Sequence, residues 1–413
     1  DQLDKPAHET YITEQTDHQI HGGDINFNYW SDNQKVKWNV YASIQDTKRD
    51  SYYGSGMDPN AYGNTHDLVV LGGAQYTLGI DNLLFMPAEF MAGAEYNHNY
   101  LHDITLGYDH DHLQKINIFS GFMQNEWRND TWGFLVGARI DKHSLVNNVI
   151  VSPRANIRFN PSKNANFRLS YSTGFRASQA FDEDFHVAVV GGERVVTVLA
   201  ENLKEESSHS VSLSSDLYFN IGNVQTNVLV EGFYTTLDDV FALRTIGQDA
   251  LGNEVLERYN GSGATVFGGN LEMRAVFSSH FSLQGGMTLQ RSRYKQAEQW
   301  SDNPNVPASK EMFRTPDAYG YFTLNYNPIK PLTLGLTGTF TGPMLMQHYE
   351  GSGTDIDVAE RTKSFADVGF KAAYDFKLFD YATLQLNAGV HNIFNSFQDD
   401  FDKGELRDSG YMY

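Results

Sequence analysis

The sequence predicts an all-β protein, specifically a transmembrane antiparallel β-barrel. The first observation is a strict period-two pattern: near the C-terminus, Ala382, Leu384, Leu386, Ala388 and Val390 alternate with polar residues and glycine. Successive side chains of a strand point to opposite faces, so such a segment has one apolar and one polar face, as a barrel in a bilayer requires. The second is a series of short polar turns between such segments, and the third is an aromatic content of 13%, with 27 Phe and 23 Tyr. Aromatic residues favour strands.

The composition excludes several other classes. Hydrophobic residues make up 40% of the 413 residues and the mean hydropathy is -0.45. No run approaches the ~18 apolar residues of a spanning helix, whereas a barrel needs an apolar residue only at every second position. The formal net charge of -20 argues against a nucleic-acid partner, because phosphates are neutralised by clustered Lys and Arg. With no cysteine, the chain has no disulfide, thiolate metal site or cysteine nucleophile.

Eight short polar turns are expected, most of them flanked by alternating strands. The apolar series often ends on an aromatic residue beside the turn, which is typical of the aromatic girdle at a membrane interface. The predicted turns are 31–34, 79–82, 128–130, 160–164, 221–223, 278–280, 327–331 and 377–380. The girdle residues are Phe159, Phe219, Phe277, Tyr326 and Phe376.

Long polar, glycine-rich connections separate the hairpins, at roughly 172–208, 237–267, 292–316 and 342–363. Short turns at one end and long loops at the other are typical of an outer-membrane barrel, with the short turns in the periplasm. Eight hairpins give about 16 strands. A soluble propeller is the alternative, but the sequence shows no blade repeat of about 40–50 residues.

Several motifs resemble the barrel of a TonB-dependent outer-membrane transporter. Ser152-Pro153-Arg154 precedes Asn160-Pro161 and the run 167–177 (FRLSYSTGFRA), where the family often has SPR, YNP and LRxSYxxGFRAP. Further on, 313–317 (FRTPD) and 390–395 (VHNIFN) resemble family segments in the family order. The stretch 181–193 is most similar to receptors of the Bacteroidetes.

The resemblance implies a bacterial outer-membrane protein with a 22-stranded barrel, an N-terminal plug domain and a TonB box. We therefore expect residues 1–413 to be a barrel fragment that lacks the plug, the first strands and the last strand, so that the 16 strands are family strands six to twenty-one. The implied function is import of a scarce large nutrient, a ferric siderophore, cobalamin or haem, through a plug rearrangement driven by TonB. The implied partners are outer-membrane lipid, the plug, TonB through the missing N-terminal part, and a surface lipoprotein over the loops.

Enzyme activity is not expected, because the sequence has no nucleophile elbow, phosphate loop or HExxH motif. Two other functions remain open. A passive porin also has about 16–18 strands, and a surface barrel would bind a partner protein through its acidic loops.

His186 is the candidate haem ligand, with haem as the transported substrate. In haem receptors that resemble this family, an axial histidine lies between a FRAP block and an NPxL block. Here Ser178 replaces the proline of the first block, and Glu201 follows Ala200 where the second should begin. A neutral imidazole ligates haem iron, but a solvated loop histidine is the favoured interpretation.

An acidic stretch, 102–112, is the candidate metal site. The carboxylates of Asp103, Asp109 and Asp111 would bind Ca²⁺ through oxygen. Their spacing fits no EF-hand, and solvated acidic loops are common. Tyr108 in the same stretch is a candidate ligand-binding residue.

A third candidate is the aromatic, glycine-rich segment 50–63. Its Tyr52, Tyr53 and Tyr62 would stack on the face of a corrin, catecholate or sugar. The alternative is a loop packed on itself. Another set of polar residues is expected to face the lumen and to pair with each other or with the plug rather than contact ligand: Arg154, Asn156, Arg158, Arg168, Glu272 and Arg274.

Overall fold

The structure is a computed structural model of the chain. It describes residues 5–10, 12–55, 57–105, 110–177, 195–248, 254–301, 303–350 and 354–397. No helix in this described part is long and apolar enough to cross a membrane.

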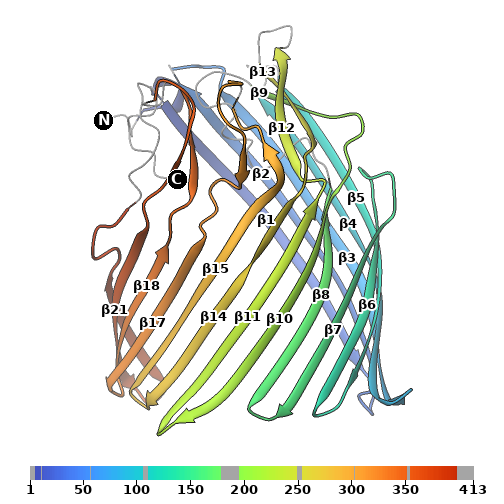
Figure 1. Ribbon diagram of the computed structural model, residues 1–413, viewed down its shortest axis with the longest axis vertical. Coiled ribbons are helices and arrows are strands. Elements are labelled where there is room, and N and C mark those ends of the chain that lie inside the picture. The colour runs from blue at the N-terminus through green and yellow to red at the C-terminus, as the bar shows by residue number, and fades with distance from the viewer. Residues whose placement is uncertain are drawn as a thin grey trace.

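The fold is a large antiparallel sheet whose long strands curve around a lumen (Figure 1). The sheet has 17 strands, of which one is the three-residue β16, Ser309–Glu311. The sixteen long strands agree with the number that the turns predict. Their bounds are β1 Ile12–Trp30, β2 Val36–Ser55, β3 Tyr62–Leu83, β4 Met86–Thr105, β5 His110–Arg128, β6 Trp132–His143, β7 Ile150–Ser162, β8 Ala165–Arg176, β10 Glu206–Ile221, β11 Val224–Asp238, β14 Ala264–Ser278, β15 Phe281–Glu298, β17 Ala318–Ile329, β18 Leu332–Thr341, β21 Phe365–Phe379 and β22 Ala382–Val390.

The pairing register confirms which residues share a face. Phe370 lies opposite Val390, and Tyr374 opposite Leu386, so the alternating apolar residues of β21 and β22 form one surface. On β18 the same surface carries Leu334 and Leu336. Threonines fill most of the opposite, luminal face of this strand. The sheet therefore has a continuous apolar outside and a polar lumen, which is the arrangement that lipid demands.

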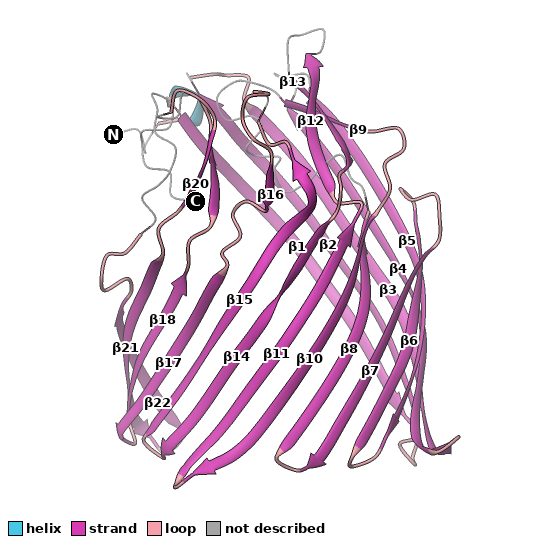
Figure 2. Ribbon diagram, in the orientation of Figure 1, coloured by secondary structure: helices cyan, strands magenta, loops and turns pink. Residues whose placement is uncertain are grey.

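Short turns join the strands at one end, which we call the turn end, and longer connections join them at the other, the loop end (Figure 2). Seven of the eight predicted turns lie where the sequence places them, within a residue or two. The turn predicted at 79–82 is wrong. β3 continues through Leu83 with a register irregularity after Ile80, and the chain reverses at Leu84, whose φ is 66°.

Aromatic rings meet one another around the turn end, as the girdle prediction requires. Phe219, Phe277, Tyr326 and Phe376 are each 42–44% exposed beside their turns. Amphipathic rings lie at the boundary between hydrocarbon and water. Ring contacts join Trp38 with Tyr76, Phe85 with Trp127, Trp132 with Phe159, Phe159 with Phe167, Phe277 with Phe281, and Phe281 with Tyr326.

The connections at the loop end contain secondary structure of their own. A small sheet consists of β9 Val195–Leu199, β12 Phe241–Gln248 and β13 Glu254–Asn260, with β9 parallel to β13. Another hairpin pairs β19 Leu345–His348 with β20 Val358–Arg361. A single 3₁₀ turn, η1, spans Ala7–Glu9 in the described part of the chain. These elements gather residues from distant parts of the sequence at the mouth of the barrel.

Candidate functional site

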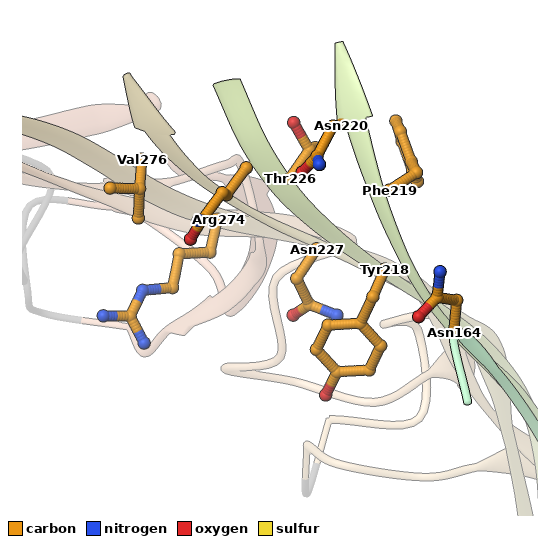
Figure 3. A pocket seen from close by; sticks show the side chains of 9 residues that line it. Asn164, Tyr218, Phe219, Asn220, Thr226, Asn227, Arg274 and Val276 are labelled. Carbon is orange, nitrogen blue, oxygen red and sulfur yellow. The ribbon is translucent and has the colours of Figure 1, made fainter. Parts of the chain in front are cut away.

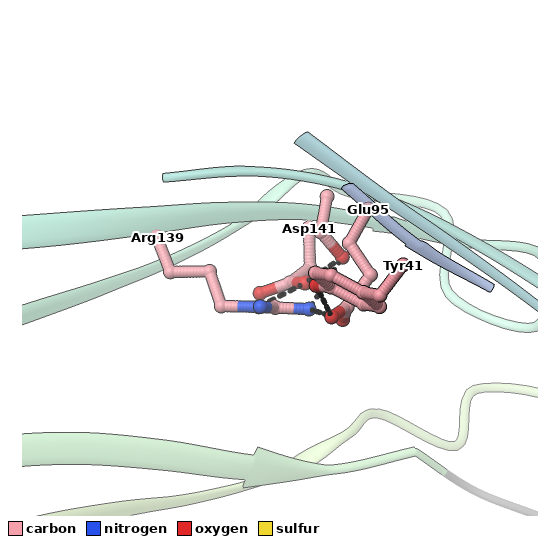
Figure 4. A network of polar contacts seen from close by, with 5 residues as sticks. Tyr41, Glu95, Arg139 and Asp141 are labelled. Atoms are coloured by element: carbon pink, nitrogen blue, oxygen red, sulfur yellow. Dashed lines mark hydrogen bonds and ion pairs between the residues drawn. The ribbon is translucent and has the colours of Figure 1, made fainter. Parts of the chain in front are cut away.

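A luminal network of polar side chains ties four strands together on the wall of the barrel (Figure 4). Glu95 of β4 accepts hydrogen bonds from the Tyr41 hydroxyl at 2.7 Å and from Arg139 Nη2 at 2.8 Å. Arg139 also donates through Nε to Asp141 Oδ1 at 2.8 Å, and the Ser120 hydroxyl donates to the same oxygen at 2.6 Å. The guanidinium therefore offsets two carboxylates, of which Asp141 is almost completely buried.

One carboxylate oxygen of this network can accept a further hydrogen bond. Asp141 Oδ2 is buried and has no hydrogen-bond partner among the described residues. A buried carboxylate oxygen without a donor is costly. The wall is thus suited to receive a donor from a group inside the lumen.

The predicted luminal arginines do lie on the inner face. Arg158 of β7 lies opposite Arg168 of β8, and Arg154 donates to the amide oxygen of Gln124 on β5. Asn156 donates to the Ser170 hydroxyl at 2.7 Å. These partners lie outside the predicted set, so pairing of its members with each other or with the plug stays a prediction. The facing arginines place positive charge on one side of the lumen.

A pocket of about 460 Å³ opens near the turn end (Figure 3). Tyr218 of β10 and Asn227 of β11 lie opposite each other in the register, and Arg274 of β14 lies opposite Asn227. The Tyr218 hydroxyl donates to Asp216 at 2.9 Å. This pocket is polar and lies far from the loop end.

A second pocket lies at the loop end and is lined by aromatic rings. It measures about 160 Å³, and its lining includes Phe241 of β12, Tyr294 of β15, and Trp300 and Phe313 of the following connection. The Trp300 and Phe313 rings meet edge to face, with centroids 5.3 Å apart. Glu298 lies at the wall and accepts from the Ser262 hydroxyl at 2.6 Å. We call this the mouth pocket.

Two guanidinium groups flank the mouth pocket. Arg176 at the end of β8 lies 5.0 Å from the centre of the Phe241 ring, and Arg258 of β13 lies 5.9 Å from it. Arg176 forms a bidentate pair with Glu206 at 2.7 and 3.1 Å. Aromatic faces combined with guanidinium groups suit a ligand that is both planar and anionic.

An ion pair between an arginine and a glutamate lies at the edge of the mouth pocket. Arg244 pairs with Glu257 and lies 4.8 Å from the Tyr259 ring. Burial raises the pKa of Tyr259, and nearby Glu298 adds to the shift, against an opposing effect of Arg244. The Tyr259 hydroxyl therefore stays neutral at physiological pH.

The predicted tyrosine segment is mostly strand rather than open loop. Tyr52 lies opposite Tyr62 in the pairing of β2 with β3, and its ring is 1% exposed in a small core with Ala7 and Ala61. The Tyr52 hydroxyl donates to the carbonyl of Asp58 at 2.9 Å. The prediction that the Tyr52 ring stacks on a ligand is wrong, because the segment packs on itself. Tyr62 is 48% exposed, whereas the side chain of Tyr53 lies outside the described residues.

The predicted calcium ligands are not brought together. Asp103 is buried on the luminal face, where it accepts from Thr65 and lies 3.4 Å from Arg49. Asp111 lies opposite Ile104, so it points to the outer face, and it pairs with His102 at 2.8 Å. Carboxylates on opposite faces of a sheet cannot share one cation.

Three predicted residues cannot be placed. Tyr108, Asp109 and His186 lie outside the described residues, so their proposed roles stay predictions. Within the described residues, no group of three or more His, Asp or Glu side chains is arranged to hold a metal ion.

The mouth pocket was missed by reasoning from the sequence. Its aromatic residues lie in two long connections, 237–267 and 292–316, that the sequence defines only as polar loops. Their one visible signal is a large aromatic side chain, such as Trp300, in a polar context. Nothing in the sequence shows that these segments meet.

The fold and the polar lumen define the class of protein: a β-barrel that crosses the outer membrane. Residues 3–393 match the family described as TonB dependent receptor-like, beta-barrel. The chain belongs to this family, and the protein lies in the bacterial outer membrane. No curated protein sequence matches the chain.

Solved structures share the fold at low identity. The siderophore receptor PirA from Pseudomonas aeruginosa has a TM-score of 0.67 and 16% identity, over 93% of this chain and 62% of that one. The ferric-catecholate import receptor Fiu from E. coli K12 has a TM-score of 0.66 and 12% identity, over 93% and 61%. The outer membrane transporter YddB from Escherichia coli has a TM-score of 0.70 and 10% identity, over 94% and 60%. The chain thus spans about three fifths of these proteins.

Proposed function

We propose that this chain forms the barrel of a TonB-dependent transporter that imports a ferric siderophore across the outer membrane. Family membership supports uptake of a scarce nutrient, and structures with the same fold include a siderophore receptor and a ferric-catecholate import receptor. Cobalamin and haem remain the alternative substrates. Transport, rather than catalysis, is the proposed activity.

The mouth pocket is the observation that favours a siderophore. At about 160 Å³ it is smaller than the ~300–1,000 Å³ that encloses a whole small-molecule ligand. It therefore fits one planar ring of a larger ligand. Rings bearing negative charge, such as iron-bound catecholates, match the Phe241 and Trp300 rings and the nearby Arg176 and Arg258.

The test compares ligands on the full-length protein. Ferric catecholate, cobalamin and haem are titrated while the tryptophan fluorescence is recorded, with Trp300→Ala and Tyr381→Ala as variants. We expect Trp300→Ala to bind the ferric catecholate about tenfold more weakly, because a buried ring contact of ~1.4 kcal/mol is lost. Tyr381 is 87% exposed at the turn end, so its variant should bind normally.

Tighter binding of haem or cobalamin than of ferric catecholate would contradict the siderophore proposal. It would leave uptake itself in place. If growth on the imported iron source continued in cells without TonB, that result would instead favour the passive-channel alternative. A surface barrel that only binds a partner protein would give no uptake phenotype at all.

The plug and TonB belong to the same proposal. Asp141 Oδ2 has no donor among the described residues, and Arg158 and Arg168 face each other, so the lumen presents groups that a plug domain would satisfy. TonB would act on the plug from the turn end. A surface lipoprotein over the loops is a further proposed partner.

Two strand edges support a larger barrel. Among the described strands, the registers give β1 the single partner β2, and β22 the single partner β21. Unpaired backbone groups are not tolerated in hydrocarbon, so these edges need further strands. We propose that they belong to a 22-stranded barrel. An experimental structure of the full-length protein with β1 paired directly to β22 would contradict this.

A further inference from the structure

A basic pocket lies on the outer surface of the barrel, immediately above its apolar face. On β15 the outward positions are Met287 and Leu289, which are 47% and 54% exposed, followed by Arg291 and Arg293. The register confirms the direction, because Leu289 lies opposite Ala318 and Arg291 opposite Phe267, both on the apolar outer face. The strand therefore changes from apolar to cationic in one step on the same face.

These two arginines have no acidic partner within the described residues. Neighbouring cations are paired: Lys295 with Asp238, and Arg361 with Glu311. Both Arg291 and Arg293 are exposed. In a chain with a net charge of -20, two adjacent guanidinium groups that form no ion pair with the described residues are a local exception.

The arginines form part of a defined concavity. A pocket of about 100 Å³ is lined by Arg291, Arg293 and Arg361, and also by the carboxylates of Glu311 and Asp317. Both carboxylates pair with Arg361, which leaves Arg291 and Arg293 without an ion pair within the described residues. Its lining is mainly polar, and Glu311 of β16 lies opposite Arg293 in the register. Guanidinium groups bind phosphate oxygens through paired hydrogen bonds.

Below the pocket the surface is apolar. Phe340 is 42% exposed there, Phe267 beside Arg291 is 41% exposed, and Leu289 lies between the pocket and the hydrocarbon region. A ligand in this place meets cationic groups at one end and an apolar wall at the other. An amphiphile with a phosphorylated headgroup has that polarity.

We propose that Arg291 and Arg293 bind the phosphate group of an anionic lipid in the outer leaflet, whose acyl chains lie against Leu289 and Met287. The inference rests on the position of the barrel in the membrane and is independent of the transported substrate. The pocket fixes the lipid at one point of the barrel circumference, next to the connection that carries the mouth pocket.

The experiment measures lipid binding to the full-length protein in detergent by native mass spectrometry. The probes are phosphorylated lipid A, its dephosphorylated form and inorganic phosphate. We expect phosphorylated lipid A to bind, and the double variant Arg291→Gln with Arg293→Gln to bind it about 25-fold more weakly, about fivefold for each cation removed. The matched control, Arg154→Gln with Arg168→Gln, removes two luminal charges and should bind the lipid as the unmodified protein does.

Equal binding by the double variant and the control would overturn the proposal. Equal binding of the phosphorylated and dephosphorylated lipids would also overturn it. Complete displacement of the lipid by millimolar inorganic phosphate would assign the pocket to a soluble anion instead. Folding of each variant is verified by its heat-dependent shift on a gel, so that lost binding is not confused with a misfolded barrel.

Discussion

Arg139 is the residue on which the luminal network depends. It is the only cation that contacts Glu95 and Asp141 within the described residues. Removing one partner of a buried ion pair costs ~3–5 kcal/mol, and the 38% exposure of the Arg139 side chain lowers that figure. We expect Arg139→Ala to reduce the free energy of unfolding by about 2 kcal/mol, measured by urea titration of the folded barrel.

The control for this prediction is Arg154→Ala, also on the luminal face. Arg154 donates to the neutral amide of Gln124 and holds no buried carboxylate, so its removal should cost under about 1 kcal/mol. Similar losses for the two variants would show that the carboxylates of the network do not depend on Arg139.

Glycine and aromatic side chains fit together across neighbouring strands. Gly338 of β18 lies opposite Phe322 of β17, and the Phe322 ring occupies the space where a side chain at 338 would begin. Overpacking of this kind costs ~1–3 kcal/mol. Gly338→Val should lower the stability by that amount, as measured by thermal unfolding in detergent.

Gly121 of β5 provides the comparison, since nothing lies within 4 Å of a Cβ built there. Gly121→Val should leave the unfolding temperature unchanged or slightly raised, because valine favours strands. Equal destabilisation at both positions would mean that the Phe322 ring is not the cause.

At the scale of an element, one acidic side chain links the described ends of the connection between β19 and β20. Asp357 accepts from the backbone N–H of Glu350 at 2.7 Å and from the Ser301 hydroxyl. These hydrogen bonds, chiefly that of Ser301, hold the pKa of Asp357 below its ordinary value of 3.8. A lowered pKa means that the contribution to stability is present above pH 3.8 and is lost as the pH falls through the folded pKa.

The titration of Asp357 is measurable by NMR or by hydrogen exchange of this loop as a function of pH. We expect protection of the Glu350 amide to persist at pH 4.5 and to disappear only at more acidic pH. Ser301→Ala should move the midpoint upward, towards the ordinary pKa of an aspartate. An unchanged midpoint would show that the serine has no part in the shift.

The strands and turns follow from the sequence because alternation has a physical cause that acts on each strand alone. β18 shows this, with leucines and threonines on its two faces over Leu332–Thr341. The length of β2 and β3 could not be predicted in the same way. Their loop ends, such as the paired Tyr52 and Tyr62, are polar or aromatic on both faces, so the alternation stops before the strand does.

The mouth pocket lay beyond prediction for a different reason. Phe241 comes from one connection and Tyr294 and Phe313 from another, and they meet only because the barrel brings the ends of β11 and β15 together. Likewise the calcium prediction placed Asp103 with Asp111 by their closeness in sequence. In the pairing of β4 with β5, Asp103 lies opposite His112 and Asp111 opposite Ile104, so the two carboxylates lie on opposite faces.

At the scale of the whole molecule, the arrangement of turns and loops predicts an orientation in the membrane. Four of the five tryptophans, Trp30, Trp38, Trp127 and Trp132, lie at the turn end, and the long connections carry the mouth pocket. In outer-membrane barrels the short turns face the periplasm and the long loops face outwards.

The chain contains no cysteine, so single cysteines report this orientation directly. Asn148 lies exposed in the connection between β6 and β7 at the loop end, and Asn223 lies exposed in the turn between β10 and β11. In intact cells, a membrane-impermeant maleimide should label Asn148→Cys and leave Asn223→Cys unlabelled, because only the first is outside. Breaking the outer membrane should expose both equally. Labelling of Asn223→Cys alone in intact cells would reverse the orientation, and would place the mouth pocket on the side from which no nutrient arrives.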